Sequence, residues 1–325
     1  MKFLKRIKAC ISRNPWLIPS SLVRKIVYPI SLYHIKQLQY HRRYCVILET
    51  SSICNAKCIF CPHQTMKRRH MIMSDYIFDQ TVKRLEEYGE PEVIGVSGFG
   101  EPLLDDKLWP RITKLRQVFP NTLLKIHTNF NKKIDNEILS QIFDCGLNEI
   151  NISINATNPI DYQRIMGLKY YQTLQNINSL LDFRILKRYP IVINVSSPVL
   201  DLQQSRKFLK IWQNVAASVI MNPLTYWRGN ISGSQREKTK HPIPCRSPWI
   251  TVGILADGRY SMCCIDYEGS FPLGNVADTS IIDNFLHRAE IQKKHIECNG
   301  RDVLICKNCD FDIWSGLDWV FPYVG

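Results

Sequence analysis

The stretch ETSSICNAKCIFCPH, residues 49–63, sets three cysteines within eight positions, at Cys54, Cys58 and Cys61. Three thiols at such spacing are typical of a metal site, and they leave that site one ligand short of four. A structural zinc site would need a fourth ligand, for which His63 is a nearby candidate. A catalytic metal site instead keeps its last position open for a substrate. The rest of the sequence has to decide between these two interpretations.

The cysteine stretch follows the first of six apolar runs that alternate with amphipathic segments. The expected strands are residues 45–51, 92–98, 123–130, 149–156, 190–197 and 217–223. The expected helices are residues 74–89, 106–119, 135–146, two between about 159 and 186, and 201–213. This alternation predicts parallel βαβ units with right-handed crossovers. The carboxyl ends of such strands share one edge, where α/β proteins bind their ligands.

The composition is that of an ordinary globular protein. Of the 325 residues, 45% are hydrophobic and 22% are charged, and the twelve cysteines are too sparse for a small disulfide scaffold. Every short apolar run near the N-terminus contains a lysine or arginine, so neither a signal peptide nor a membrane span is predicted. We therefore expect a cytoplasmic protein whose clustered cysteines serve metal binding or catalysis.

The positive charge is concentrated at the N-terminus. Residues 1–48 hold ten Lys and Arg and no Asp or Glu, so they carry most of the net charge of +13. Apolar residues between Phe3 and Ile11 fall on one face of a short helix that Pro15 ends. Such a helix can lie on an anionic surface, for example peripherally at the inner membrane, or pack on the main domain. The main body has no basic stripe with interleaved aromatics, so no specific nucleic-acid binding is predicted.

Two further features connect the cysteine stretch to a known family. Phe60 is an aromatic residue directly before the third cysteine, and SGFGEPLL, residues 97–104, is a glycine-rich segment after the second expected strand. With the C-x3-C-x2-C spacing, they resemble the radical S-adenosylmethionine (radical SAM) superfamily over roughly residues 44–225. The resemblance implies an α/β fold with a partial (β/α)6 barrel. It also implies that the three cysteines hold a 4Fe–4S cluster whose open iron binds SAM, with Phe60 at the cofactor site.

The resemblance further implies which residues bind SAM. Gly98, Gly100 and Glu101 would meet its methionine end, where N–H groups can bind the carboxylate and Glu101 the ammonium. Ser153 and Asn155, at the end of the fourth expected strand, would bind the ribose hydroxyls. From the residues alone, the glycines could equally serve a turn with positive φ angles, and polar residues are common at strand ends. Reductive cleavage of SAM would give a 5′-deoxyadenosyl radical that abstracts hydrogen from a substrate.

A second set of cysteines follows in the C-terminal part. Seventeen residues separate Cys245 from Cys263, with Gly258 between them, and Cys306 and Cys309 form C-x2-C. This layout resembles the SPASM/twitch extension of radical SAM enzymes in its shorter form with a single cluster. The resemblance implies a small C-terminal Fe–S domain in which these four cysteines hold an auxiliary 4Fe–4S cluster. A structural zinc ribbon would use the same four thiolates.

The domain organisation follows from these assignments. We expect a basic segment over residues 1–44, the radical SAM core over 45–228 and the SPASM/twitch domain over 229–325, with one amphipathic helix near 279–293.

Cys264 and Asp266 are the candidate catalytic residues of this C-terminal part. Cys264 could be a spare ligand, a packing residue or a hydrogen-atom donor, and Asp266 could accept a proton or close a turn. We expect a radical SAM oxidoreductase that oxidises a C–H of a sugar, an aminocyclitol or a peptide by two electrons. An epimerase with a cysteine donor, a peptide maturase and a zinc-binding interaction module are the alternatives. The expected partners are a small-molecule or peptide substrate and an electron donor such as flavodoxin or ferredoxin.

Overall fold

The computed structural model describes residues 29, 33, 37, 43–187, 190–199, 202–223, 245–297, 303, 305, 306 and 309. The expected helix between Phe3 and Ile11 and the stretch around the expected boundary at residue 228 lie outside the described residues. The chain forms two compact units. The barrel unit combines residues 45–224 with 252–281, and the second unit combines residues 1–44, 225–251 and 282–325. The linear division of the domains at residue 228 stays a prediction.

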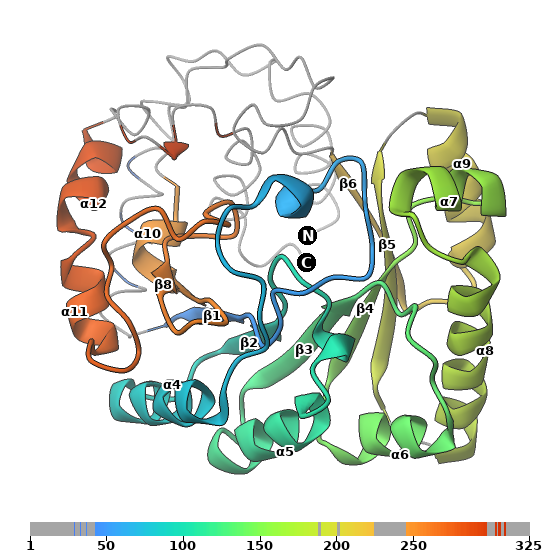
Figure 1. Ribbon diagram of the computed structural model, residues 1–325, viewed down its shortest axis with the longest axis horizontal. Coiled ribbons are helices and arrows are strands. Elements are labelled where there is room, and N and C mark those ends of the chain that lie inside the picture. Colours follow the sequence, from blue (N-terminus) through green and yellow to red (C-terminus); the bar gives the residue numbers. More distant parts are fainter. Residues whose placement is uncertain are drawn as a thin grey trace. The chain divides into compact units, whose positions relative to one another are not determined.

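A curved sheet forms the core of the barrel unit, and its first six strands are parallel. They are β1 (Cys45–Leu48), β2 (Val93–Val96), β3 (Leu123–Thr128), β4 (Glu149–Ser153), β5 (Val192–Val199) and β6 (Ser218–Pro223). Each strand pairs with the one before it in the chain. Figure 1 shows helices along the outer side of this sheet. The arrangement confirms the expected α/β fold with a partial (β/α)6 barrel.

Six helices connect or follow these strands. They are α4 (Asp75–Tyr88), α5 (Leu108–Val118), α6 (Asn136–Asp144), α7 (Pro159–Met166), α8 (Tyr170–Lys187) and α9 (Leu202–Trp212). Ser74, Asp135 and Asn158 are N-caps, and each side chain accepts a hydrogen bond from the N–H three residues on. These caps explain why the expected helix starts agree closely with the observed ones.

The two faces of the sheet differ in chemistry because side chains alternate along each strand. Ten apolar residues beneath the helices are at most 2% exposed: Val46, Leu48, Ile94, Val96, Leu124, Ile126, Ile150, Ile152, Ile193 and Val195. The alternate positions form the inner face and are mostly small or polar: Gly95, Ser97, Lys125, His127, Glu149, Asn151, Ser153, Asn194 and Ser196. Burial of the apolar residues beneath the helices therefore determines which face of the sheet is the outer one, and the polar side chains lie on the inner face.

A short hairpin extends the sheet beyond β1. It consists of β7 (Thr251–Ile254) and β8 (Tyr260–Ser261), which are antiparallel, and the strand order is β6-β5-β4-β3-β2-β1-β7-β8. The N–H of Glu49 donates to the carbonyl of Ile254 at 2.9 Å. Gly258 has a φ of +84° in the connecting turn, which explains its place in the motif. The segment that carries Cys263 is therefore part of the barrel unit.

The C-terminal helical region differs from its expectation. Besides the short α10 (Ser247–Ile250), it has two helices, α11 (Ile281–Leu286) and α12 (Ala289–Ile296), instead of one near 279–293. The break falls at Arg288, whose buried guanidinium donates to the carbonyl of Thr251 and to Asn284 Oδ1, both at 2.6 Å. The hydrogen bonds of this buried guanidinium place the break between the two helices at Arg288, and the spacing of apolar residues in the sequence does not indicate it. In the part of the chain that the structure describes, no helix is long and apolar enough to cross a bilayer.

Candidate functional site

The cysteine loop, residues 54–61, lies at the edge of the sheet where the carboxyl ends of the strands meet. The N–H of Lys57 donates to the carbonyl of Met166, at the end of α7, at 2.7 Å. At the other end of the loop, the N–H of Cys61 donates to the carbonyl of Cys58 at 3.0 Å. Backbone hydrogen bonds therefore hold the loop at the position that the sequence predicts.

The three thiols of this loop are half-buried and close enough to affect one another. Burial raises the pKa of each of them, to about 12 for Cys54, and the other two thiols raise that of Cys58 further. The N–H of Ala56 points at the Cys54 sulfur at 3.4 Å. The sulfurs would therefore be thiolates only beside a positively charged metal group. Three thiols on one short loop, one of them facing a peptide N–H, match in number and chemistry the ligands of a 4Fe–4S cluster with one open iron.

His63, the candidate fourth ligand of a zinc site, makes other contacts. Its Nε2 donates to the carbonyl of Ser52 at 3.0 Å, and its ring meets that of His70 edge-on at a centroid distance of 4.6 Å. Among the described residues, no three His, Cys, Asp or Glu side chains are already grouped as they would be around an ion. The structure thus does not join His63 to the three thiols.

The glycine-rich segment, residues 97–101, packs directly on the strand end that leads into the cysteine loop. A Cβ added at Gly100 would lie 2.1 Å from the carbonyl oxygen of Ser51, and one at Gly98 would lie 2.6 Å from Cγ of Glu49. Neither glycine has a positive φ angle. Gly100 is required because two backbone segments approach closely, and Gly98 because the Glu49 side chain packs against it; the alternative of a turn with positive φ is wrong.

Glu101 connects this segment to the carboxyl end of β3. Its carboxylate accepts hydrogen bonds from Thr128 Oγ1 at 2.5 Å and from the N–H of Asn129 at 2.7 Å. A third bond, from the N–H of Leu103 at 3.1 Å, caps η4 (Pro102–Leu104). The residue is 2% exposed, and burial raises the pKa of its carboxyl to about 7. Because both oxygens already have donors, binding of the SAM ammonium would use the remaining lone pairs, and this role stays a prediction.

The neighbouring strand ends contribute amides and hydroxyls. Asn129 Nδ2 donates to Asn55 Oδ1 in the cysteine loop at 2.7 Å. Ser153 Oγ, at the end of β4, lies 3.4 Å from Ser196 Oγ on β5, and Asn155 is 6% exposed. The structure therefore joins β3 directly to the cysteine loop. Ribose binding by Ser153 and Asn155 stays a prediction, as does the cofactor contact of the half-buried Phe60.

One charged residue of the site was not singled out from the sequence. Glu49 is 1% exposed, and its carboxylate pairs with Arg68 and accepts a hydrogen bond from the N–H of Ala256. Its partners lie 19 and 207 positions away in the chain. No local pattern can reveal such contacts.

The cysteines of the second set are all half-buried and fall in both units. Cys245, Cys306 and Cys309 belong to the second unit, and Cys263 belongs to the barrel unit. The N–H of Cys309 donates to the carbonyl of Cys306 at 3.2 Å, in a turn like that of the cysteine loop. The sulfur of Cys306 lies 3.5 Å from Nε2 of His295, which is 5% exposed and was not singled out from the sequence. The four thiols remain the predicted ligands of the auxiliary cluster.

The two candidate catalytic residues of this region differ in their surroundings. Asp266 is fully buried, and its carboxylate accepts hydrogen bonds from the N–H groups of Met262 at 3.1 Å and Ser270 at 2.8 Å. These bonds favour the role of closing a turn over that of accepting a proton. Cys264 is half-buried, which leaves part of its surface accessible.

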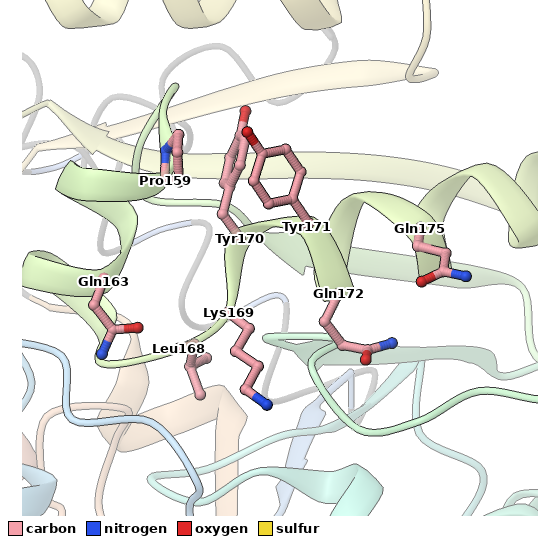
Figure 2. A pocket seen from close by; sticks show the side chains of 8 residues that line it. All are labelled: Pro159, Gln163, Leu168, Lys169, Tyr170, Tyr171, Gln172 and Gln175. Carbon is pink, nitrogen blue, oxygen red and sulfur yellow. The ribbon is translucent and has the colours of Figure 1, made fainter.

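A shallow hollow of about 440 Å³ lies where α7 meets α8. Its lining residues are Pro159, Gln163, Leu168, Lys169, Tyr170, Tyr171, Gln172 and Gln175. Figure 2 shows the two tyrosines pointing to one side of the junction and Lys169 and Gln172 to the other. No residue predicted from the sequence to bind a cofactor or substrate lines this hollow.

Two family models match parts of this chain. Residues 48–195 match the radical SAM superfamily, and residues 245–310 match SPASM, an iron–sulfur cluster-binding domain. An uncharacterized protein of Methanocaldococcus jannaschii is 25% identical over 189 residues, which are 56% of this chain and 58% of that protein. A probable GTP 3′,8-cyclase of Methanococcus maripaludis is 29% identical over 113 residues, 34% of this chain and 36% of that protein. The chain thus spans only 36–58% of the length of these relatives.

Three solved structures share the fold. BtrN in complex with AdoMet and 2-DOIA has a TM-score of 0.57 at 17% identity, covering 82% of this chain and 93% of that one. Streptococcus suis SuiB bound to the precursor peptide SuiA has a TM-score of 0.63 at 10% identity, covering 80% and 69%. The enzyme anSMEcpe with bound AdoMet has a TM-score of 0.59 at 14% identity, covering 86% and 97%. At these identities the likeness shows the fold alone.

The two matched families coincide with the two sets of cysteines, one on the parallel sheet and one in the C-terminal part. Residues 48–195 therefore form a radical SAM domain and residues 245–310 a SPASM domain, so that the cofactors are S-adenosylmethionine, a 4Fe–4S cluster and auxiliary iron–sulfur clusters.

Proposed function

We propose that this radical SAM enzyme oxidises a small substrate, a sugar or an aminocyclitol, by two electrons. Abstraction of hydrogen from a carbon that bears O–H or N–H leaves a substrate radical. That radical becomes C=O or C=N when it loses one electron and one proton. Four thiols at Cys245, Cys263, Cys306 and Cys309 would saturate an auxiliary cluster, which supplies an electron acceptor and leaves no iron for substrate binding.

The observation that carries the proposal is the polar inner face of the barrel sheet. Asn194 Nδ2, on β5, donates to Glu149 Oε1 at 2.6 Å and to Asn151 Oδ1 at 3.1 Å, both on β4. Lys125 and His127 follow on the same face of β3, in register with Glu149 and Asn151. Asn151 and Asn194 are 2% and 4% exposed and bond to each other, so they shape this face from within. The more accessible Lys125, His127 and Glu149 are the groups that suit a substrate with hydroxyl or amino groups. They do not suit an apolar one.

His127 is the candidate on this face for the group that accepts the proton. Its side chain is accessible to solvent, but the surrounding protein desolvates the imidazolium and, with Lys125 nearby, lowers the pKa to about 4. The ring is thus neutral at pH 7, and one of its nitrogens can accept a proton. Asp266 is less suited, because turn N–H groups bind both of its oxygens.

Two other reactions remain candidates. A half-buried Cys264 close to a predicted cluster ligand could return a hydrogen atom to the substrate radical, which would make the enzyme an epimerase. Modification of a peptide is the second alternative. In all three cases the enzyme needs a reductant, for which we propose flavodoxin or ferredoxin. Attachment to an anionic membrane through residues 1–44 is a further proposal, and it concerns a segment largely outside the described residues.

The test combines discovery of the substrate with isotope labelling. Metabolites of a deletion strain, compared with wild type by mass spectrometry, identify the compound that accumulates. That compound, the reconstituted enzyme, SAM and dithionite are then incubated in deuterated water. An oxidised product, formed equally by Cys264→Ala, supports the dehydrogenase. Deuterium at an inverted carbon, lost in Cys264→Ala, would establish the epimerase and overturn the proposal. A His127→Gln variant that keeps wild-type turnover at pH 7 would remove His127 from the mechanism.

A further inference from the structure

Four segments of the barrel unit meet at the carboxylate of Glu49. Its Oε1 accepts hydrogen bonds from Arg68 Nη2 at 2.5 Å and from the N–H of Phe99 at 3.1 Å, and its Oε2 accepts one from the N–H of Ala256 at 3.1 Å. The side chains of Glu49 and Arg68 are only 1% and 4% exposed. The packing is tight, since a Cβ on Gly98 would collide with the Glu49 side chain. One buried carboxylate thus holds the glycine-rich segment and the turn after β7 at the same time.

Arg68 extends this connection toward the segment of the second cysteine set. Its Nε donates to the carbonyl of Tyr267 at 2.5 Å. In return, the carboxylate of Glu268 accepts hydrogen bonds from the N–H groups of Lys67 at 2.8 Å and Arg68 at 3.1 Å. The ring of Tyr267 also meets that of Phe99 at a centroid distance of 5.6 Å. Residues 67–68 and 267–268 are therefore fastened to each other by side chains and backbone together.

We propose that Glu49 and Arg68 are positioning residues that couple the SAM-binding part of the site to the segment carrying Cys263. Glu49 lies five residues before Cys54, and the amide that it holds, that of Phe99, lies between the two glycines expected at SAM. Tyr267 lies four residues after Cys263. One guanidinium thereby bonds to two segments, each next to a predicted cluster ligand, and sets the distance between them. The inference depends on the family's cofactors and not on the proposed oxidation.

The chemistry of arginine explains why this position suits a coupling role. The guanidinium is planar and donates along fixed directions, so that bonds to Glu49 and Tyr267 fix its orientation as well as its distance. A buried ion pair is often no more stabilising than an apolar pair of the same size, so stability alone does not account for it. A lysine at position 68 could still pair with Glu49, but it could not bond to Tyr267 in the same geometry.

The test uses the reconstituted holoenzyme and three variants. Arg68→Gln removes the charge. Arg68→Lys keeps the charge but loses the donor that bonds to Tyr267. Arg111→Gln is the matched control. Arg111 is also buried in an ion pair, with Asp105 at 2.8 Å, but that pair involves no residue of 256–268. Three readouts are taken: amide hydrogen exchange, the KM and kcat for formation of 5′-deoxyadenosine with dithionite, and the EPR spectra of both reduced clusters.

We expect Arg68→Gln to speed amide exchange at Phe99 and over residues 256–268, and to raise the KM for SAM about fivefold or more while kcat changes less. Arg68→Lys should keep the KM near wild type but still speed exchange over 256–268 and alter the EPR signal of the auxiliary cluster. Arg111→Gln should lower the unfolding temperature without either effect. The inference is overturned if exchange, KM and EPR spectra in both Arg68 variants match those of Arg111→Gln. Should Arg68→Gln not fold, Arg68→Lys alone decides. If wild type forms no 5′-deoxyadenosine, amide exchange still tests the coupling, while the assigned chemistry fails separately.

Discussion

Gly100 and Ser51 are in direct backbone contact, so close that a Cβ on the glycine would lie 2.1 Å from the serine carbonyl oxygen. The N–H of the next residue, Glu101, donates to the carbonyl of Ile53 at 2.8 Å. Both contacts fall within three residues of Cys54. They join the glycine-rich segment to the start of the cysteine loop, so that the expected SAM site and the expected cluster site share one piece of backbone.

Gly100→Ala should therefore disrupt SAM binding as well as stability. Because a backbone carbonyl cannot move aside like a flexible side chain, we expect a loss of about 1–3 kcal/mol in the free energy of unfolding. SAM affinity, measured by equilibrium dialysis on the reconstituted enzyme, should fall at least about tenfold. The control is Gly95→Ala, since a Cβ there would meet its nearest atoms at 3.7 Å, an ordinary contact. Equal effects of the two substitutions would contradict the close-approach argument.

Substitution of single cysteines should remove the two clusters one at a time, so that their roles can be distinguished. Wild type should bind about eight irons per chain, and both Cys54→Ala and Cys263→Ala about four. Cys54→Ala should form no 5′-deoxyadenosine, because it loses the cluster that binds SAM. Cys263→Ala should still cleave SAM in the presence of dithionite. The control is Cys145→Ala, which removes a buried thiol of α6's C-terminal end and should keep all the iron. Zinc instead of iron in wild type would contradict the assignment.

The buried carboxyl of Glu101 should lower the free energy of unfolding as pH rises, which is the opposite of what a carboxylate in an ion pair does. Its pKa is raised by burial to about 7 in the folded protein, from an ordinary value of 4.5. At this carboxyl the folded state therefore binds more protons than the unfolded one between these values, and the contribution of Glu101 to stability should fall as pH rises from about 4.5 to 7. The loss amounts to about 3 kcal/mol at most.

Urea unfolding of the SAM-free enzyme over this pH range measures the effect. Glu101→Gln should remove the fall that Glu101 causes, so the prediction is read from the difference between the wild-type and Glu101→Gln curves. His127, whose pKa is lowered to about 4, contributes a rise in both proteins and cancels in that difference. A difference that does not fall between pH 4.5 and 7 would contradict the prediction. The ammonium of bound SAM should stabilise the carboxylate and shift the fall in stability to higher pH.

His295 should tune the potential of the auxiliary cluster. Its Nε2 lies 3.5 Å from the sulfur of Cys306, and an N–H donated to a thiolate ligand favours the more negative, reduced state of a cluster. His295→Phe should lower the midpoint potential by about 50–100 mV in an EPR-monitored titration. The exposed His287 provides the control, because His287→Phe should leave the potential unchanged. Equal potentials in wild type and His295→Phe would rule out this hydrogen bond.

The sequence predicts those parts of the molecule that depend on short-range patterns. The caps at Ser74, Asp135 and Asn158 act within one helical turn, and the alternation of strands and helices predicts the parallel sheet without any knowledge of distant contacts. The cysteine loop is placed by the same logic, because it directly follows the end of β1 at the carboxyl edge of the sheet.

Features that depend on distant partners could not be predicted. The need for glycine at position 100 arises from Ser51, and the role of Glu49 depends on Arg68 and Ala256. The break at Arg288 follows from a carbonyl 37 positions away, that of Thr251. In each case the deciding partner is far along the chain, where neither periodicity nor spacing carries information.

The β7–β8 hairpin has a practical consequence for anyone who wishes to dissect this protein. A fragment ended at the expected boundary, residue 228, would lose the strand that pairs with β1. It would expose the edge of β1, next to the cysteine loop, and leave Glu49 without its backbone partner Ile254 and without the N–H of Ala256. Exposed edge strands of this kind pair with strands of other chains and promote aggregation. The isolated barrel is thus a poor target for expression, and trimming must spare residues 252–281.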